Sequence, residues 1–340
     1  MIYPHVSVVI VSYNSREDLI ECIPSLLSQS YSDFEVIVVD NNSADGTITF
    51  IEKNYPSIKV IRNTENYGPA KGYNIGIISS GGKYVVLLNP DTVVGKGWLV
   101  DLVRVMEADE SIGACQSRVL LYEKPDIINT EGNEVNFLGF TWCRNYNQVS
   151  KDTEVIVETL GLSVCSAILR RDVLNEINLF DEDFFMYLDD TDLGLRMWLA
   201  GHKVVCNPTS IVYHKYKITM GRQKLFYLER NRLLLLLKIY DRSMWLRIFL
   251  IFFFMEMGIF AFSIQKRWFR EKVKSYIWIL KRWRLMIVKR KHVRREKKHL
   301  NKILNMMSPE ITFEEIQNPI LHKIVNPVLR RYYQILFITF

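Results

Sequence analysis

The sequence lacks any pattern of cysteines that would indicate a disulfide framework or a zinc site. Its five cysteines are odd in number and scattered, without a C-x-x-C spacing: Cys22, Cys115, Cys143, Cys165 and Cys206. Reduced thiols of this kind are typical of a cytosolic compartment. No signal-peptide pattern is visible either, because Met1–His5 leads straight into an apolar run at Val6. We therefore expect the bulk of the protein to stay in the cytosol.

Low-complexity linkers and internal repeats are absent as well. Hydrophobic residues make up 49% and charged residues 24% of the 340-residue chain, which supports a sizeable core and argues against wholesale disorder. The length exceeds the usual ~100–200 residues per domain. One large domain with an appendage is therefore expected.

The net positive charge of the chain is concentrated near its end. The formal net charge is +7, yet residues 266–298 carry 15 Lys and Arg against Glu271 and Glu296. The remainder of the chain is therefore net negative, and the basic character belongs to this segment.

The first part of the chain alternates short apolar runs with helical patterns. This alternation predicts βαβ units and a mainly parallel sheet with helices on both faces, an α/β fold. The expected strands are Val6–Val11, Phe34–Val39, Ile58–Arg62 and Tyr84–Leu88, and the expected helices cover about 17–29, 46–54 and 70–79.

Three of these strands end in small polar or acidic clusters: Ser12–Ser15, Asp40–Ser43 and Asn89–Asp91. In open α/β sheets ligands bind at the carboxyl ends of the strands. The alternative is that these residues only form turns, as at most strand ends. Three clusters in one βαβ array favour a binding site.

Beyond Thr130 the pattern is less regular and predicts antiparallel strands. We expect strands at Val155–Thr159, Ser163–Leu169, Val204–Cys206 and Ile211–Tyr213, and a helix from about Thr191 to Ala200 that ends at Gly201.

Five motifs in order resemble the family-2 inverting glycosyltransferases with a GT-A fold, especially the rhamnosyltransferase-like branch. Each motif is short, but their order and spacing match over about residues 5–240. They are Val8–Asn14, Val38–Thr47, Asn66–Gly68, Leu87–Asp91 and the stretch from Phe180 to Leu193.

The resemblance implies a nucleotide-sugar donor held by the first four motifs. Asp40 would accept the N3–H of a pyrimidine base, although an Asp at this position also suits a helix cap; Asp45 is the better candidate for that cap. Lys71 would lie near the diphosphate or be a solvated helix lysine. The implied donor-binding residues are Ser12, Tyr13, Asn14, Asp40, Asn42, Asn66, Gly68, Lys71, Asn74 and Asn89.

Asn89-Pro90-Asp91 stands where the family carries its D-x-D metal motif. Mg²⁺ typically uses one or two carboxylates together with phosphates and water. Asp91 supplies a carboxylate, whereas Asn89 would touch ribose or a metal-bound water. His214 matches a family position that often supplies a third ligand, with a structural histidine as the alternative. Asp91, His214 and Mg²⁺ or Mn²⁺ thus form the expected metal site.

Three acids, Asp189, Asp190 and Asp192, directly follow the apolar run 184–188. Like charges in a partly buried site raise at least one carboxyl pKa, which suits a general base. The resemblance makes Asp190 the base and Asp189 its support, while Asp192 would begin a helix. The alternative is that all three are a solvated helix start.

Met244–Ile264 is apolar and has about the ~20 residues needed to span a bilayer. Glu256 near its centre would cost about 2.5–3.5 kcal/mol on insertion. The amphipathic segment Val273–Val288, rich in Trp and cations, is typical of an anionic membrane surface, although its apolar stripe would also suit core packing. We expect a helix that lies in the interface, or a re-entrant hairpin. Residues 233–237 are expected to belong to the core.

Together these patterns predict a GT-A catalytic domain at 1–225 and a helical, apolar and basic membrane-associating region at 226–340. The expected function is transfer of a hexose or deoxyhexose, with inversion, from a UDP- or dTDP-sugar to a lipid-linked or surface-glycan acceptor. The protein would act in polysaccharide and cell-envelope biosynthesis at the cytoplasmic side of the membrane, peripheral or monotopic, with the membrane surface bound through 244–298 and no nucleic acid expected.

Three alternatives remain. A sugar nucleotidyltransferase has a Gly-rich, Arg-containing loop after its first strand, whereas Ser12–Arg16 contains no glycine. A membrane- or RNA-binding protein would depend on the basic segment, where Trp278 and Trp283 lie among cations. The third alternative is an inactive glycosyltransferase homologue that acts as a scaffold.

Overall fold

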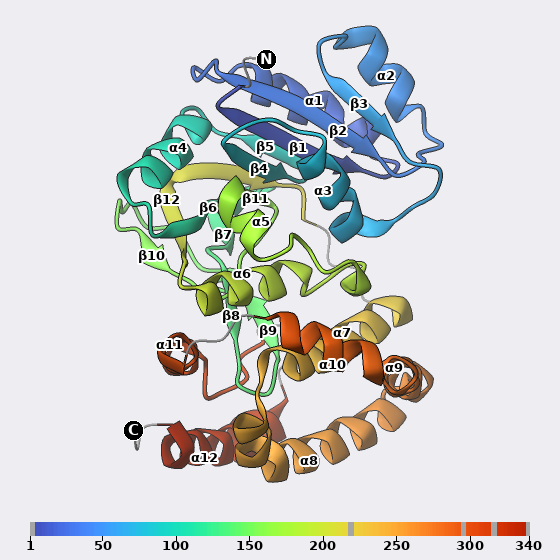
Figure 1. Ribbon diagram of the computed structural model, residues 1–340, viewed down its shortest axis with the longest axis vertical. Coiled ribbons are helices and arrows are strands. Elements are labelled where there is room, and N and C mark those ends of the chain that lie inside the picture. Colours follow the sequence, from blue (N-terminus) through green and yellow to red (C-terminus); the bar gives the residue numbers. More distant parts are fainter. Residues whose placement is uncertain (1–3, 217–220, 294–296, 314–317, 338–340) are drawn as a thin grey trace. The chain divides into compact units, whose positions relative to one another are not determined.

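A mostly parallel sheet forms the centre of the first of two units into which the chain divides. The computed structural model describes residues 4–216, 221–293, 297–313 and 318–337 (Figure 1). The first unit comprises Met1–Asn133 and Cys143–Lys217, and the second comprises Glu134–Trp142 and Ile218–Phe340. This division differs from the expected boundary at residue 225, which would cut helix α7 (Arg222–Ile239).

The sheet follows the order β10-β12-β6-β11-β4-β1-β2-β3. Strands β4, β1, β2 and β3 are mutually parallel, and β6 is parallel to β12, whereas β11 is antiparallel to both β4 and β6. β5 pairs with β12 and β7 with β6. The strands are β1 (Val6–Ser12), β2 (Phe34–Asp40), β3 (Lys59–Arg62), β4 (Tyr84–Leu88), β5 (Thr92–Val94), β6 (Ile112–Leu121), β7 (Lys124–Thr130), β10 (Val157–Glu158), β11 (Ser166–Arg170) and β12 (Lys203–His214).

Helices cover both faces of this sheet, as the α/β pattern predicts (Figure 1). Side chains alternate along a strand, so Val8 and Ile10 of β1 join the core under α1 (Arg16–Leu27), α2 (Thr47–Asn54) and α4 (Trp98–Ala108). Val9 and Val11 instead approach Gly76 and Gly72 of α3 (Gly68–Ile78) on the opposite face. The short helix α5 (Arg171–Glu176), the 3₁₀ turn η1 (Glu182–Phe184) and α6 (Asp189–Ala200) complete the first unit.

The second half of the sheet departs from the sequence-based expectations. Two short strands predicted around residues 204–213 are one strand, β12, whose register against β6 shifts between Asn207 and Ile211. Pro208 lies in this interval and has no N–H to donate, so the ladder is interrupted while the strand continues. The strands predicted at 155–159 and 163–169 are shorter or displaced, and α4 and β5–β7 were not predicted at all.

The second unit is helical. Its elements are α7, α8 (Arg242–Gln265), α9 (Phe269–Lys281), α10 (Trp283–His292), α11 (Lys297–Met306), the π-helical turn η2 (Leu321–Val325) and α12 (Asn326–Phe337), with the paired strands β8 (Asn133–Val135) and β9 (Thr141–Cys143). The amphipathic segment 273–288 is helical on both sides of a break at Arg282 (φ −113°, ψ 13°), where α9 ends and α10 begins. The predicted core segment 233–237 is confirmed at Leu233–Leu236, which are buried.

Candidate functional site

The carboxyl ends of three neighbouring strands bring the polar clusters to one edge of the sheet. Ser12 of β1 pairs in register with Asp40 of β2, and Ile10 pairs with Leu88 of β4. The loops that follow these strands therefore start side by side, roughly 5 Å apart per strand. The three polar clusters that follow these strands in the sequence are therefore neighbours at one edge of the sheet.

The loops after β1 and β2 are hydrogen-bonded to each other. Asn14 accepts from the Ala44 amide through Oδ1 and donates its own amide to Ser43 Oγ, both at 2.8 Å. Asn14 and Asn42 have φ of 52° and 64°, a conformation that Asn adopts more readily than most residues. Ser12 is buried and Tyr13 is half exposed, so the two loops form one rigid, partly open corner.

Asp40 is buried in this corner with one oxygen unsatisfied. Its Oδ2 accepts from the Ser43 amide at 2.9 Å, while Oδ1 has no hydrogen-bond partner among the described residues. Buried polar atoms are normally paired, so this oxygen fits an N–H that arrives with a ligand. Asp45, not Asp40, accepts from the Thr47 amide at the start of α2, and the alternative of Asp40 as helix cap is not supported.

Residues 66–74, which lead into α3 and form its first turns, make contacts mainly with the acid-bearing segment. Asn66 Oδ1 accepts from the Gly68 amide at 2.9 Å, and a Cβ on Gly68 would lie 2.7 Å from the Phe185 carbonyl oxygen. Asn74 bonds both backbone groups of Phe180 at 3.0 Å. Lys71 Nζ lies 3.6 Å from the centre of the Tyr67 ring. These contacts show that the residues help to fix the local backbone. That Asn66, Gly68, Lys71 and Asn74 also contact the donor stays a prediction.

Asp91 and His214 lie together although they are far apart in the chain. β5 begins directly after Asp91 and pairs with the end of β12, with His214 opposite Thr92. Asp91 Oδ2 is 3.3 Å from His214 Nε2, and the Lys215 amide donates to the Asp91 carbonyl at 2.9 Å. Strand pairing therefore fixes this carboxylate–imidazole pair.

Asp91 and His214 could supply two ligands to a divalent cation, with the remaining ligands coming from a bound diphosphate or from water. His214 Nδ1 lies 2.8 Å from Asn129 Oδ1, which can only accept, so Nδ1 carries a proton. Nε2 is the ring atom that faces Asp91, and a cation would bind it in place of a second proton. Asp91 Oδ1 is buried and makes no hydrogen bond within the described part of the chain. The described residues contain no group of three His, Cys, Asp or Glu able to hold a metal by themselves, so phosphate or water oxygens would complete the shell.

Asn89 is oriented by Tyr73. The Tyr73 hydroxyl donates to Asn89 Oδ1 at 3.0 Å, and the Asn89 amide donates to the Cys165 carbonyl at 3.0 Å. Burial raises the pKa of Tyr73 well above its usual value, and the nearby Asp189, Cys165, Asp91 and Asp190 raise it further. Tyr73 therefore lies within electrostatic reach of both acidic motifs, which the structure brings to one region.

Asp189 and Asp190 open helix α6 in an apolar setting. Asp190 accepts from the Thr191 amide at 2.7 Å and from Asn133 Nδ2 at 3.4 Å. Burial raises the pKa of Asp190 to about 6, although these hydrogen bonds oppose the rise. Burial, and then the charge of Asp190, raise the pKa of Asp189 well above its usual value. Of the two carboxyls, Asp189 is the one that burial and the neighbouring charge push more strongly towards the protonated form.

Asp192 has a different role from its neighbours. The helix already begins at Asp189, and Asp192 Oδ2 forms a buried ion pair with Arg196 Nε at 2.7 Å. Asp192 thus lies in the first turn of α6, near the expected helix start, although it is not the first residue of the helix. Its carboxylate stabilises α6 in the core.

The residues before the acids are held in an unusual conformation. Phe185, Tyr187 and Leu188 have φ of 61°, 65° and 59°, which is costly for non-glycine residues and clusters at functional sites. Asn74 and Gly68 hold this loop from α3. The left-handed backbone of the 185–188 loop, held by Gly68 and Asn74, therefore sets the orientation of Asp189 and Asp190 at the start of α6.

Two polar partners, Asn129 and Asn133, were missed by the sequence-based reasoning. They belong to β7 and the start of β8, a part of the chain to which no element had been assigned. An isolated Asn in a strand carries no local signal for its partner, so only the pairing of β6 with β7 and the bridge between Asn133 and Gly161 reveal them.

Comparison with known proteins gives a family and a fold. The family model described as Glycosyl transferase family 2 matches residues 7–177. An uncharacterized glycosyltransferase of Haemophilus influenzae is 32% identical over 117 residues, which cover 34% of this chain and 36% of that protein. The N-acetylglucosaminyl-diphospho-decaprenol L-rhamnosyltransferase of Mycobacterium tuberculosis is 27% identical over 250 residues, 66% of this chain and 80% of that protein.

Among solved structures, GalNAc-T7 with UDP, GalNAc and Mn²⁺ aligns with a TM-score of 0.59 at 17% identity, covering 71% of this chain and 49% of that one. The chain thus spans about a third to a half of the first relative and of this structure. At such identity the likeness concerns the fold, and it confirms the GT-A fold expected from the motifs.

Proposed function

Because a family model matches half of its length, the chain belongs to glycosyl transferase family 2, and from this premise we propose that it transfers a sugar with inversion. The donor is a UDP- or dTDP-sugar, and the acceptor is a lipid-linked or surface-glycan hydroxyl. The observation that carries the proposal is the convergence of Asp91, His214, Asp189 and Asp190 around Tyr73 and Asn89.

The corner around Asp40 suits the nucleobase of the donor. Its free Oδ1 fits the N3–H that uracil and thymine share. We propose as the donor-binding shell Ser12, Tyr13, Asn14, Asn42, Asn66, Gly68, Lys71, Asn74 and Asn89. Of these, Ser12 ends β1, and Asn42 and Asn89 follow the ends of β2 and β4.

Asp91 and His214 would hold Mg²⁺ or Mn²⁺ against the diphosphate. When bound, such a cation supplies Lewis-acid stabilisation of the leaving nucleoside diphosphate. The chain's own contribution is to orient His214 through Asn129 and to leave a carboxylate oxygen unpaired.

Asp190 would act as the general base. The acceptor oxygen attacks the anomeric carbon, its proton passes to the Asp190 carboxylate, and the bond from the anomeric carbon to the diphosphate oxygen breaks with the electron pair leaving on the nucleotide. A pKa of about 6 leaves this carboxylate ionised at neutral pH. Asp189, whose protonated form is favoured by burial and by the charge of Asp190, would support it.

The second unit would bring the enzyme to the cytoplasmic side of the cell membrane, as a peripheral or monotopic protein, through residues 244–298. Helix α8 is long and apolar enough to cross a bilayer, the one such helix among the described residues. This location fits a role in polysaccharide or cell-envelope biosynthesis, where acceptors are lipid-linked.

The test is metal-dependent release of nucleoside diphosphate from a panel of nucleotide sugars, with and without glycan acceptors. Asp190→Asn should lower turnover about 10²–10⁴-fold while donor binding persists, and Asp91→Ala should abolish the metal response. Asp126→Asn, on an exposed strand residue, is the matched control. Normal turnover by Asp190→Asn would refute the base assignment.

A further inference from the structure

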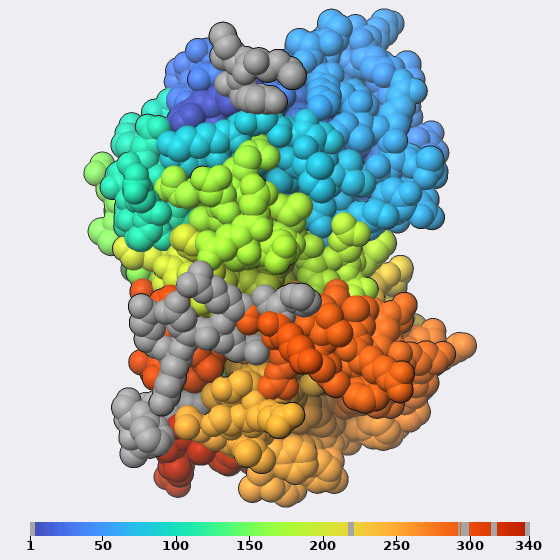
Figure 2. Space-filling model, viewed as in Figure 1, coloured from blue at the N-terminus to red at the C-terminus, as the bar shows by residue number. Residues whose placement is uncertain are grey.

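Helix α8 presents an apolar stripe at the surface of the second unit. Its members recur at intervals of three and four residues, which places them on one side of a helix. They are between 38% and 82% exposed and comprise Leu246, Phe249, Leu250, Phe253, Phe254, Met257, Phe260 and Ile264. This part of the chain is golden in Figure 2, where it lies at the surface.

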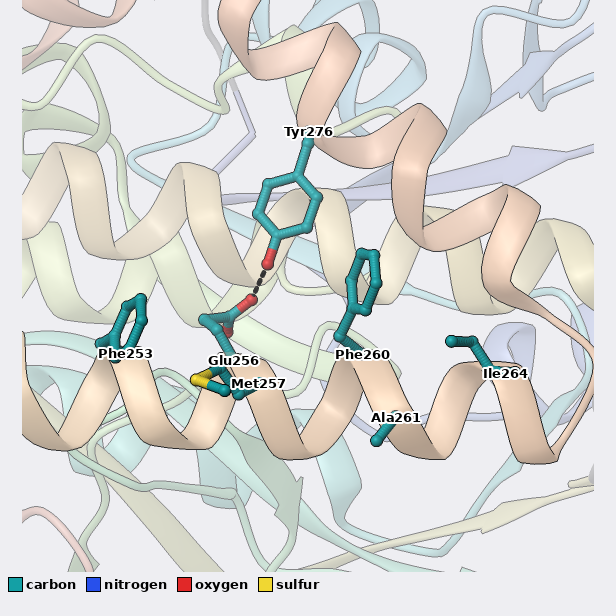
Figure 3. Close-up of a pocket in the computed structure, with 7 residues that line it drawn as sticks. All are labelled: Phe253, Glu256, Met257, Phe260, Ala261, Ile264 and Tyr276. Carbon is teal, nitrogen blue, oxygen red and sulfur yellow. Dashed lines mark hydrogen bonds between the residues drawn. The ribbon is translucent and has the colours of Figure 1, made fainter.

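Beside this stripe, α8 carries a buried charge, Glu256. Its carboxylate accepts from Lys272 Nζ at 2.8 Å, from the Tyr276 hydroxyl and from Arg232. The bond to Tyr276 of α9 is drawn in Figure 3. Glu229 of α7 pairs with both cations, at 3.1 Å from Arg232. Helices α7, α8 and α9 are therefore joined by a closed network of two acids and two bases.

This network keeps Glu256 ionised. Burial alone would raise the pKa of its carboxyl, but Arg232 and Lys272 lower it to about 2. The middle of α8, at its fifteenth of 24 residues, is thus fixed to charged partners on two other helices. It is not an isolated acid that could be neutralised to enter hydrocarbon.

A spanning orientation would take those partners into the bilayer centre. Lys272 would lie at the depth of Glu256, and the exposed Arg270 and Lys274 are only two residues away on α9, about 3 Å along its axis. Whatever the direction of α9, both would lie within the ~30 Å hydrocarbon core. Exposed cations at that depth carry a high insertion cost.

A flat orientation avoids this cost and uses the same residues. The stripe would meet hydrocarbon while Lys266, Arg267, Arg270 and Lys274, all exposed, would meet anionic headgroups. A groove of about 440 Å³ runs along the stripe between α8 and α9, lined by Phe253, Met257, Phe260, Ala261 and Ile264 with Glu256 and Tyr276 (Figure 3). Its mostly apolar lining fits acyl chains.

We propose that α8 lies within one leaflet of an anionic bilayer, with the stripe towards the hydrocarbon, and does not cross it. The inference rests on the membrane association in the proposed function and adds the partner chemistry, the inserted residues and the topology. The Glu256–Lys272–Arg232–Glu229 network is what holds the helix flat against α7 and α9.

Topology is tested with Ser243→Cys and Gln265→Cys, exposed positions at the two ends of α8, in the full chain expressed in bacteria. A membrane-impermeant maleimide should label both in inside-out vesicles and neither in intact cells, after subtraction of labelling of the parent protein. Labelling of either position from outside the cell would mean that α8 spans, and would overturn the proposal.

Leaflet insertion is tested by flotation of the purified chain with phosphatidylglycerol-containing vesicles and with phosphatidylcholine vesicles. Leu250→Asp or Phe254→Asp, each at a position 58% exposed, should reduce binding to anionic vesicles at least tenfold. Ile78→Asp, at a 73% exposed position on α3, should not. Equal binding of all variants, no binding by the parent, or equal binding to both vesicle types would contradict the proposal.

Nucleoside diphosphate release in detergent separates this inference from the proposed function. The stripe variants should retain release in detergent because the stripe lies outside the catalytic unit. If the parent protein releases no nucleoside diphosphate but shows the expected labelling and flotation, the proposed transferase activity is refuted. The proposal that α8 lies within one leaflet is then still supported.

Discussion

Asn129 accepts a hydrogen bond from Nδ1 of His214 at 2.8 Å, while the other ring nitrogen faces Asp91 at 3.3 Å. Asn129 thereby fixes both the tautomer and the plane of the imidazole. Three strands cooperate in this arrangement, because β7 supplies Asn129, β12 supplies His214, and β5 begins after Asp91. The relationship makes Asn129 a positioning residue for the proposed metal site.

We expect Asn129→Ala to raise the Mn²⁺ concentration for half-maximal activity about 10–100-fold, the usual cost of losing such an outer partner. Turnover at saturating Mn²⁺ should change little. Asn129→Asp keeps an acceptor and should restore much of the affinity, and Asn54→Ala, on an exposed helix residue, is the control. The measurement is a Mn²⁺ titration of nucleoside diphosphate release, and an unchanged midpoint in Asn129→Ala would count against the site.

The acid limb of the pH profile should report Asp190. A general base works only when ionised, so with a pKa of about 6 the rate should be level above about pH 7. It should fall about tenfold per pH unit below 6. The measurement is turnover between pH 4.5 and 8.5 at saturating donor and cation.

Asp189→Asn distinguishes the two neighbouring acids. Burial and the charge of Asp190 favour the protonated form of Asp189, and a neutral Asn mimics that form beside Asp190. We expect the acid limb to keep its midpoint within about half a pH unit. A large downward shift would show that Asp189 is ionised and that the proton assignment is reversed.

The buried network of the second unit should respond strongly to the loss of one member. Glu256→Gln leaves Lys272 and Arg232 undercompensated, and we expect a loss of about 3–5 kcal/mol in the free energy of unfolding. Glu52→Gln removes the partner of Arg62 in an exposed ion pair and should cost less than about 1 kcal/mol. Urea unfolding of both variants makes the comparison.

The same network has a defined pH dependence. The Glu256 pKa is lowered from 4.5 to about 2 on folding, so its stabilisation is complete above pH 4.5 and is lost as the pH falls towards 2. Unfolding of the parent should therefore become easier across this window, and Glu256→Gln should lack that part of the change. Parallel curves for parent and variant would contradict the assignment.

The sequence predicted the first half of the sheet well because its signals are local. Runs such as Val6–Val11 and Tyr84–Leu88 are buried on both sides and bounded by turn residues, and the structure places strands there within one residue. Asp91 and His214 were also found from motif order, and the pairing of β5 with β12 brings them together.

Other features depend on tertiary contacts that no local pattern encodes. Asn129 has no signal until β7 is paired with β6, and Asp192 looks like its acidic neighbours until Arg196 is seen beside it. In the sequence, Glu256 is an unpaired charge within a possible membrane-spanning segment. In the structure its carboxylate is hydrogen-bonded by Arg232, Lys272 and Tyr276 from two other helices. In each case the sequence shows the residue type but not the partner that determines its role.

Gly68 and Gly97 form a matched pair with which to test the loop before the acids. Both have positive φ, 76° and 74°, but a Cβ on Gly68 would lie 2.7 Å from the Phe185 carbonyl, whereas on Gly97 the nearest atom is Asp101 Oδ2 at 3.6 Å. Alanine at either position should cost about 1–2 kcal/mol for the left-handed conformation. Only Gly68→Ala should also displace the 185–188 loop and lower turnover about 10–100-fold, since small misplacements of catalytic groups are costly. Thermal unfolding and turnover measured on both variants decide the matter: equal turnover would show that the Phe185 contact does not position Asp190.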